Sequence, residues 1–570
     1  MPRSVTVSGT YTVADYLFDR IAELGVRHIF GVPGDFNLGF LDTVLAHDQL
    51  EWVGNNNELN GGYAADGYAR LKGFGAMVTT FGVGELSAIN ASGGSYAEYA
   101  PVLHIVGAPS TATRKKGGKV HHTLGDGDFT HFFDMARHVS CAQAWLDDTS
   151  APADIDRVIR TMLAEHRPGY IVLPQDIADV PVYRPDEPIN QDEVRRHTTS
   201  SGALKAFAEA AAEFLDGRQA TVLTDMLVLR VGARDQLINL LDHCDLPYCT
   251  LTWGKSIVYE NSERFAGIYT GVASPPATKD AVENAERLIA AGVEFTDSTS
   301  AGFSMRINPE NMLRIDPGKV TVGGRGFAPI AMADALDTLT TIITTDATVS
   351  PHPLKKETVS PTTEVDPDTP LTQNELWTII ADWMPGDTLC LADQGTSFFG
   401  MAQKPVPDTT LFMGQPLWGS IGYTIPAALG AAIGDDRNRR PIVLIGDGSA
   451  QLTVQEIATH LRQKTCPVIV LVNNDGYTIE RTIHGPDQAY NDIAPYNWQY
   501  IPKAFGATDD TALVLDARTP NQLREALAQA EQATDKLVFV EVHTDADDTP
   551  DFLATVFDAI KASGSQPAGE

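Results

Sequence analysis

Apolar residues along the chain fall into two kinds of pattern. From residue 13 to residue 24 they recur every three or four positions, which predicts an amphipathic helix, and Thr12 and Asp15 have the spacing of a capping box. Elsewhere they form short unbroken runs bounded by Gly, Pro or Asp, which is typical of strands buried on both faces of a parallel sheet. Helical and strand patterns therefore alternate.

The strand-like runs fall into three groups, separated by polar, proline-containing stretches at 183–202 and 350–372 that are typical of linkers. The runs lie at 27–35, 76–82, 100–109 and 169–176; then at 220–225, 246–254 and 312–318; and then at 388–397, 441–449, 466–476 and 536–545. Helical patterns between them include 203–215 and 279–292.

This alternation predicts the fold class α/β, with three doubly wound parallel-sheet domains. The expected bounds are 1–185, 200–350 and 373–550, followed by a C-terminal helix and tail at 551–570. A length of 570 residues agrees with several hydrophobic cores rather than one.

Charge and cysteine content narrow the choice of partners. The chain has 42 Lys and Arg against 74 Asp and Glu, a net charge of −32, and such a surface repels nucleic acid and anionic membranes. Its five cysteines have neither a CxxC nor a zinc-site spacing, and the first residues carry no apolar leader pattern. We therefore expect a cytoplasmic protein that binds neither nucleic acid nor membrane.

Two polar motifs, GDGS and NNDG, end consecutive strands of the third group. In a βαβ unit both strand ends lie at the same edge of the sheet, so we expect Asp447 and Asn474 to lie close together. Their side-chain oxygens and a backbone carbonyl suit Mg²⁺, while Gly448 lets the backbone approach a phosphate to which Ser449 can donate. GDG alone is typical of an ordinary strand-to-helix turn, but the pair of motifs favours a diphosphate–Mg²⁺ site.

Two adjacent histidines, His121 and His122, lie in the glycine-rich stretch GGKVHHTLGDGDF. Neighbouring side chains of an extended loop point in different directions, so we do not expect the pair to chelate one metal. The stretch by itself is compatible with a solvated polar loop or with an acid/base pair, because histidine is the side chain that titrates nearest neutrality.

These motifs resemble those of thiamin diphosphate enzymes, and among them the 2-oxo acid decarboxylases that act on pyruvate, indolepyruvate, phenylpyruvate and branched-chain oxo acids. The resemblance covers nearly the whole chain and includes GVPGDFN, NELNGGYAADGYAR, TTFGVGELSA, HHTLGDGDF, DQGTS, WGSIGYT and IHGP. It implies a pyrimidine-binding first domain, a middle domain without cofactor and a diphosphate-binding last domain. It also implies thiamin diphosphate and Mg²⁺ as cofactors, and a homotetramer, built as a dimer of dimers, with active sites at the dimer interface.

The resemblance assigns roles to residues of this chain. Glu58 matches the glutamate that hydrogen-bonds the cofactor's pyrimidine ring. Non-oxidative decarboxylation through a cofactor ylid and enamine needs several proton transfers, and the residues that match those acids and bases are Asp35, His121, His122 and Glu480. The remaining cofactor contacts would be Thr396, Gly419, Ile421, Gly448, Ser449 and Ile479, and the metal ligands Asp447, Asn474 and the Gly476 carbonyl.

The resemblance implies a 2-oxo acid as the substrate, and several residues bear on the side chain that this acid would carry. Gln394 resembles the indolepyruvate and branched-chain branches, and the Phe398-Phe399 pair resembles the branched-chain enzymes. Ile479 is bulkier than the valine common in branches with large substrates. Val556 and Ile560 have an i, i+4 spacing that suits either a pocket wall or plain core packing. These residues favour branched-chain and aromatic oxo acids.

Four other functions are compatible with parts of the pattern. A pyruvate decarboxylase would share the whole mechanism, and a carboligase of the acetohydroxyacid synthase type would share GDGS and NN. The synthases generally lack the His pair and Glu480, which argues against them. A non-catalytic cofactor-binding scaffold would have lost its acid/base residues, and an acidic α/β assembly protein would leave the motifs to coincidence.

Overall fold

The computed structural model describes residues 10–191, 194, 198–355 and 368–562. The chain divides into two compact units: Met1–Arg195 with Leu429–Asp436, and Arg196–Ala428 with Arg437–Glu570. The predicted tail from residue 563 onward and parts of both predicted linkers lie outside the described residues.

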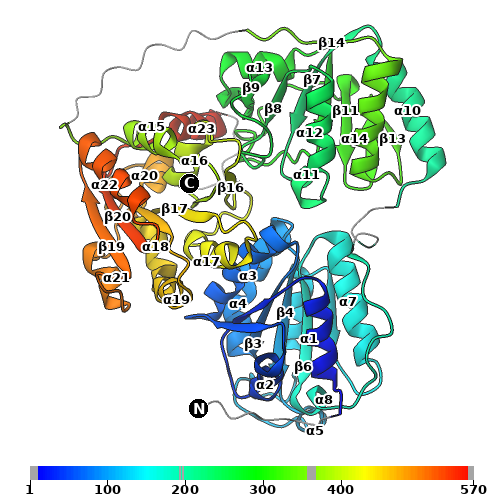
Figure 1. Cartoon of the computed structure of the whole chain (residues 1–570), viewed down its shortest axis with the longest axis vertical. Coiled ribbons are helices and arrows are strands. Elements are labelled where there is room, and N and C mark those ends of the chain that lie inside the picture. The colour runs from blue at the N-terminus through cyan, green and yellow to red at the C-terminus, as the bar shows by residue number, and fades with distance from the viewer. Residues whose placement is uncertain (1–9, 192–193, 195–197, 356–367, 563–570) are drawn as a thin grey trace. The chain divides into compact units, whose positions relative to one another are not determined.

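The first unit contains a parallel sheet of six strands in the order β2-β1-β3-β4-β6-β5. Its strands are β1 (His28–Gly31), β2 (Glu51–Gly54), β3 (Gly75–Thr80), β4 (Val102–Ala108), β5 (Ala142–Trp145) and β6 (Gly169–Pro174). Its helices are α1 (Val13–Glu23), α2 (Leu38–Ala46), α3 (Glu58–Lys72), α4 (Val83–Ala97), α5 (Thr111–Lys115), α6 (His131–Ala136), α7 (Ala151–Glu165) and α8 (Gln175–Ala178). Helices α3 and α4 pack together on one face, and α1 and α7 on the other (Figure 1).

The predicted capping box is confirmed at the start of α1. The Thr12 hydroxyl accepts a hydrogen bond from the backbone N–H of Asp15, and the Asp15 carboxylate accepts one from the backbone N–H of Thr12. The two bonds satisfy N–H groups that have no partner inside the helix.

The second sheet follows the order β13-β12-β11-β10-β7-β8-β9. Its strands are β7 (Arg218–Thr224), β8 (Tyr248–Thr250), β9 (Phe265–Ile268), β10 (Arg287–Ala291), β11 (Met312–Asp316), β12 (Lys319–Val322) and β13 (Arg325–Phe327), with β14 (Val349–Pro351) beside β7. The strands β11, β12 and β13 pair antiparallel, so this sheet is mixed at one edge. The helices are α10 (Ser201–Leu215), α11 (Leu227–Arg230), α12 (Arg234–His243), α13 (Pro276–Glu283) and α14 (Met332–Thr341).

The predicted helix at 279–292 is wrong in its second half. Helix α13 ends at Glu283, and the following apolar run forms β10 between β7 and β11. A short apolar run has no periodicity that separates a strand from a helix, and here burial on both faces of the sheet decides the outcome.

The third sheet has the order β16-β15-β17-β18-β20-β19, all parallel. Its strands are β15 (Thr388–Ala392), β16 (Leu411–Met413), β17 (Arg440–Gly446), β18 (Val468–Asn473), β19 (Ala512–Ala517) and β20 (Leu537–His543). The helices are α15 (Gln373–Trp383), α16 (Thr396–Ala402), α17 (Thr424–Gly434), α18 (Asp447–Thr453), α19 (Ile457–Gln463), α20 (Thr478–His484), α21 (Ile501–Ala504), α22 (Pro520–Gln532) and α23 (Asp551–Ala562).

Numbered along their own segments, the strands of the first and third sheets have the same order, 2-1-3-4-6-5. In both sheets the order reverses between the first and third strands, and in an open α/β sheet ligands bind outside the carboxyl ends of the strands at such a point. The three α/β domains of the prediction are therefore present, and the two outer sheets offer equivalent binding positions.

Candidate active site

Three oxygen atoms converge at the carboxyl ends of β17 and β18. The side-chain oxygen of Asn474 lies 3.1 Å from Asp447 Oδ1 and 3.0 Å from the carbonyl oxygen of Gly476. In the other orientation of the amide its nitrogen donates to the same two oxygens and its oxygen accepts from the Thr478 hydroxyl at 2.9 Å, so the three groups meet at one point in either orientation. The amide oxygen faces the other two oxygens in the orientation that would serve a metal. Adjacent ligands of octahedral Mg²⁺ are about 3 Å apart, since each lies about 2.1 Å from the ion. The spacing suits a small divalent cation.

The backbone around this point has room only for glycine at two positions. Gly476 has φ +130°, and a Cβ there would lie 2.2 Å from the carbonyl oxygen of Asn491. A Cβ on Gly448 would lie 2.5 Å from the Tyr477 ring. A larger residue at either place would displace the turn that holds Asp447 and Asn474.

Asp447 is a buried carboxylate that lacks a cationic partner among the described residues. Its oxygens accept hydrogen bonds from the backbone N–H groups of Gly448 and Gly476, at 2.7 and 3.1 Å. Burial nevertheless raises the pKa of Asp447 to about 6, and the hydrogen bonds offset only part of that rise. A divalent cation would supply the missing positive charge, so the donor set fits a metal.

A pocket adjoins this point. Its lining includes most of the cofactor contacts expected from the sequence: Thr396, Ile421, Gly448, Ser449 and Ile479, together with Asp447, Asn474, Gly476 and Gln394. Within the described residues, the buried Ser397 hydroxyl and the Gln394 side-chain oxygen find no hydrogen-bond partner. Polar atoms left unsatisfied beside a pocket fit a polar ligand such as a diphosphate.

Asp393, at the end of β15, anchors the segment that carries Gly419 and Ile421. Its Oδ1 accepts a hydrogen bond from the Gly422 N–H at 3.1 Å, and its Oδ2 accepts from the Thr424 N–H at 3.1 Å and the Thr424 hydroxyl at 2.8 Å. Burial raises the pKa of this carboxyl, and the hydrogen bonds oppose the rise. Gly422 directly follows Ile421, so Asp393 fixes the backbone beside that side chain.

Sequence reasoning missed Asp393. It named the neighbouring Gln394 and treated the strand end as a family motif only. The available signal was an acidic residue directly after a buried apolar run, the same position that drew attention to Asp447 one strand away.

Asp35, His121 and His122 form a cluster in the first unit. His121 Nε2 lies 2.6 Å from Asp35 Oδ2, and His122 Nδ1 lies 4.0 Å from Asp35 Oδ1. Phe36 stacks on the His121 ring with centroids 4.9 Å apart. The side chains of Asp35 and His121 are 49% and 60% exposed, so these groups can exchange protons with a bound molecule or with water.

The expectation that the two histidines point in different directions was wrong. Their ring centroids are 4.6 Å apart, and the ligating atoms of both rings and of Asp35 lie within 4.8 Å of one another. The reason is the backbone at His122, which has φ +66° and so departs from an extended loop. The cluster has the composition of an acid/base group and is also compatible with a metal.

The other predicted catalytic residues lie on helices. Glu58 is the first residue of α3, which Asn57 caps through a 2.8 Å hydrogen bond from the Asn60 N–H. A Cβ on Gly84 would lie 3.1 Å from Glu58 Oε1, so the glycine leaves room for that carboxylate. Glu480 is exposed on α20, in the unit that holds the three-oxygen point.

Two of the predicted substrate-pocket residues, Gln394 and Ile479, line the pocket described above, and the others lie in or against the hydrophobic core of the third sheet. Phe398 and Val556 are buried in one hydrophobic cluster, against which Ile479 and Ile560 are partly buried. A Cβ on Gly414 would lie 2.8 Å from the Phe398 ring, so that ring is held closely. The burial of Val556 in this cluster is compatible with both possibilities given for it, a pocket wall and plain core packing.

None of the helices in the described ranges combines the length and the apolar character needed to cross a membrane.

Comparison with known proteins identifies the family. Residues 11–132, 207–342 and 387–542 match the N-terminal, central and C-terminal domains of thiamine pyrophosphate enzymes. The chain is 50% identical over 535 residues to an alpha-keto-acid decarboxylase of Mycolicibacterium paratuberculosis, with 93% of each chain covered. It is 49% identical to the protein of that name from Mycobacterium tuberculosis, and 48% to that from Mycobacterium ulcerans, with at least 93% of each chain covered. The chain therefore belongs to the family of thiamin diphosphate-dependent 2-oxo acid decarboxylases.

Proposed function

We propose that this protein removes CO₂ from 2-oxo acids without oxidation and releases the corresponding aldehyde, using thiamin diphosphate and Mg²⁺. The observation that carries the proposal is the presence in one chain of two groups: the three-oxygen point at Asp447, Asn474 and Gly476, and the cluster of Asp35 with two histidines. The names of the relatives, alpha-keto-acid decarboxylases, support the same activity.

The binding residues divide between the two ends of the cofactor. Asp447, Asn474 and the Gly476 carbonyl would hold Mg²⁺, and the diphosphate contacts would be Thr396, Gly448, Ser449 and Ile479. The pyrimidine contacts would be Glu58, Gly419 and Ile421. When bound, thiamin diphosphate supplies the carbon that attacks the oxo group and takes up the electron pair that departing CO₂ leaves.

The acid/base residues would move protons at two atoms of the substrate. The oxo oxygen needs a proton when its carbon is attacked and must lose it when aldehyde leaves, and the carbon that lost CO₂ needs a proton as well. Asp35, His121, His122 and Glu480 are the candidates. The contact between Asp35 and His121 would set which ring nitrogen carries a proton.

We propose that branched-chain and aromatic oxo acids are preferred to pyruvate. Phe398, Ile479, Val556, Ile560 and Gln394 are the residues on which this preference would depend. One methylene in an apolar pocket changes discrimination by only about 1–3 kcal/mol, so we expect broad specificity with a preference rather than exclusion.

Two further proposals concern the assembly and its place in the cell. We propose a homotetramer with active sites at the dimer interface; large apolar side chains that are exposed in the single chain, such as Leu124 and Val83, support an interface. We also propose a cytoplasmic location, which the five free cysteines support. Light scattering of the purified protein tests the first proposal, and fractionation of cells tests the second.

The test of the function is steady-state aldehyde release, coupled to NADH oxidation by an alcohol dehydrogenase, with thiamin diphosphate and Mg²⁺ present. Pyruvate, 4-methyl-2-oxopentanoate, phenylpyruvate and indolepyruvate are compared in parallel. Highest kcat/KM for the branched or aromatic acids would support both proposals. A preference for pyruvate would overturn the substrate proposal alone, and no aldehyde from any acid would overturn the function.

A further inference from the structure

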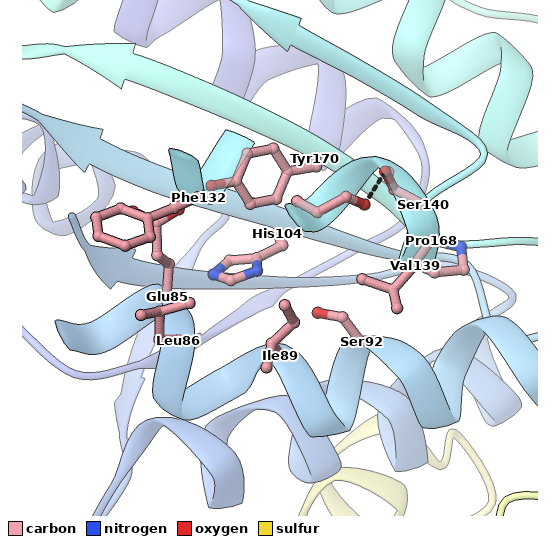
Figure 2. Close-up of a pocket in the computed structure, with 12 residues that line it drawn as sticks. Glu85, Leu86, Ile89, Ser92, His104, Phe132, Val139, Ser140, Pro168 and Tyr170 are labelled. Carbon is pink, nitrogen blue, oxygen red and sulfur yellow. Dashed lines mark hydrogen bonds between the residues drawn. The ribbon is translucent and has the colours of Figure 1, made fainter. Parts of the chain in front are cut away.

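A small closed pocket in the first unit is lined by Glu85 and Ser92 of α4, His104 of β4 and Tyr170 of β6 (Figure 2). The four side chains are almost completely buried. None of them was assigned a role from the sequence. Burying an acidic side chain costs free energy unless hydrogen bonds or a cation compensate for the water that it loses.

Glu85 bonds to two groups. Its Oε1 accepts a hydrogen bond from the backbone N–H of Gly82 at 2.6 Å, and its Oε2 accepts one from the Tyr170 hydroxyl. Burial raises the pKa of Glu85 to about 7, although both hydrogen bonds favour the ionised form. The nearby His104 remains neutral, because burial lowers its pKa to about 3. The carboxyl is therefore held by hydrogen bonds rather than by a cation.

Gly82, the backbone that Glu85 holds, has an unusual conformation. Its dihedral angles, φ +65° and ψ −92°, lie near those of the rare and strained form of the γ-turn. Such a conformation persists only where hydrogen bonds and close packing hold it. A Cβ at Gly82 would lie 1.9 Å from the carbonyl oxygen of His122. The His122 backbone therefore rests directly on the Gly82 backbone.

His122 is itself held in a left-handed conformation, with φ +66°. In that conformation its ring lies beside the ring of His121, which contacts Asp35 at 2.6 Å, and its own Nδ1 lies 4.0 Å from Asp35 Oδ1. Without a contact that holds the backbone in place, a non-glycine residue would readily leave the left-handed region, because this region is less stable than the extended or helical regions. Gly82 supplies the support, and Glu85 holds Gly82.

We propose that Glu85 is a positioning residue for the catalytic histidines: it fixes the Gly82 backbone on which His122 rests. The proposal rests on the decarboxylase function proposed above. Glu85 has no role in transferring protons to substrate in this scheme. Its effect passes through Gly82 to His122, and the Tyr170 hydroxyl keeps the carboxyl in place.

The test compares Glu85→Ala with His122→Ala and with the double variant in the full-length enzyme, loaded with thiamin diphosphate and Mg²⁺. Since a shift of about 1 Å in a catalytic group can cost about 100-fold, we expect Glu85→Ala to lower kcat by about 10- to 100-fold. The double variant should be no slower than His122→Ala alone, within twofold. Multiplied losses in the double variant, or an unchanged kcat in Glu85→Ala, would overturn the proposal.

Two variants serve as controls. Glu85→Gln retains an oxygen that accepts from Gly82 and an amide that can donate to Tyr170, so it should retain more than half of kcat. Ser92→Ala removes a hydroxyl from the same pocket and helix and should behave as the unaltered enzyme. If Glu85→Ala does not fold, Tyr170→Phe loosens the carboxyl instead and is expected to lower kcat in the same direction, again only where His122 is present.

Hydrogen exchange measured by mass spectrometry gives a readout that does not depend on activity. Glu85→Ala should speed exchange in residues 117–129. A purely structural role at the start of α4 would speed exchange near residues 82–86 and leave 117–129 unchanged, which would contradict the proposal. If no oxo acid is decarboxylated by the unaltered enzyme, the proposed function fails, while exchange in 117–129 still decides whether Glu85 holds the histidine segment.

Discussion

The two candidate parts of the active site are built in different ways. At the ends of β17 and β18 the polar groups are buried, follow directly from strands, and are held by backbone N–H donors. Asp35 and His121, in contrast, are exposed side chains on irregular segments, with His122 in a strained backbone conformation. A site that binds a metal and a diphosphate can be positioned by strand ends alone. A group that moves protons needs access to substrate, so it is positioned by contacts with neighbouring residues.

The comparison is tested most severely at Asp447. We expect Asp447→Ala to lower aldehyde release by at least about 1000-fold, because it removes a charged metal ligand. Titration calorimetry should show loss of Mg²⁺-dependent thiamin diphosphate binding. The control is Asp475→Asn, a neighbouring exposed residue with φ +55° that asparagine tolerates; equal losses in both would show that the turn, not the Asp447 carboxylate, matters.

At the exposed cluster the effect should fall on catalysis alone. We expect Asp35→Asn to lower kcat by about 100- to 1000-fold, since a positioned acid/base group contributes about 10²–10⁴. Cofactor affinity, measured by the same calorimetry, should not change. The matched control is Asp126→Asn, which breaks the similar exposed pair of Asp126 and His131 at 2.7 Å. A weaker cofactor affinity in Asp35→Asn would mean that the two parts are not separate.

Glu85 gives the first unit a dependence on pH that the Gln variant should lack. Because folding raises the pKa of Glu85 from 4.5 to about 7, the folded state holds this proton more tightly than the unfolded state. The contribution to stability is complete below pH about 4.5 and is lost as pH rises to about 7, a change on the order of 3 kcal/mol.

Urea unfolding of the unaltered protein and of Glu85→Gln across this pH range measures the difference. The free energy of unfolding of the unaltered protein should fall relative to that of the variant as pH rises. A constant difference from pH 4.5 to pH 7 would show that Glu85 does not titrate in this range.

The smallest effect is expected at Asp393. In Asp393→Asn one of the two oxygens becomes an NH₂ group, which faces the N–H donors of Gly422 or Thr424 instead of accepting from them. We expect the apparent affinity for thiamin diphosphate to fall about tenfold, the size of one hydrogen bond to a charged group. Thr424→Ser keeps the hydroxyl and should bind as before, and normal binding by Asp393→Asn would remove its role in fixing Ile421.

The sequence was most informative where function depends on strand ends. Apolar runs locate the strands, and parallel pairing then brings Asp447 and Asn474 together although 26 residues separate them in the chain. The same rule would have found Asp393. It does not decide short runs such as 287–291, because only the neighbours of that segment in the sheet make it a strand.

The residues of the histidine cluster follow from the family resemblance, but the geometry of the cluster could not be predicted from the sequence. Its geometry depends on the left-handed backbone of His122, and that conformation depends on a contact with Gly82, forty residues earlier. The role proposed for Glu85 depends on the same contact between Gly82 and His122. Within its own segment Glu85 cannot be distinguished from a glutamate that only caps a helix. Roles that pass through tertiary contacts have no periodicity or motif of their own.

The first and third sheets use one strand order for different candidate chemistries. In the first sheet Asp35 follows β1, the first strand, and His121 and His122 come after β4, the fourth strand. In the third sheet Asp393 follows the first strand, Asp447 the third and Asn474 the fourth. The same connectivity therefore presents candidate proton donors and acceptors in one sheet and candidate metal ligands in the other.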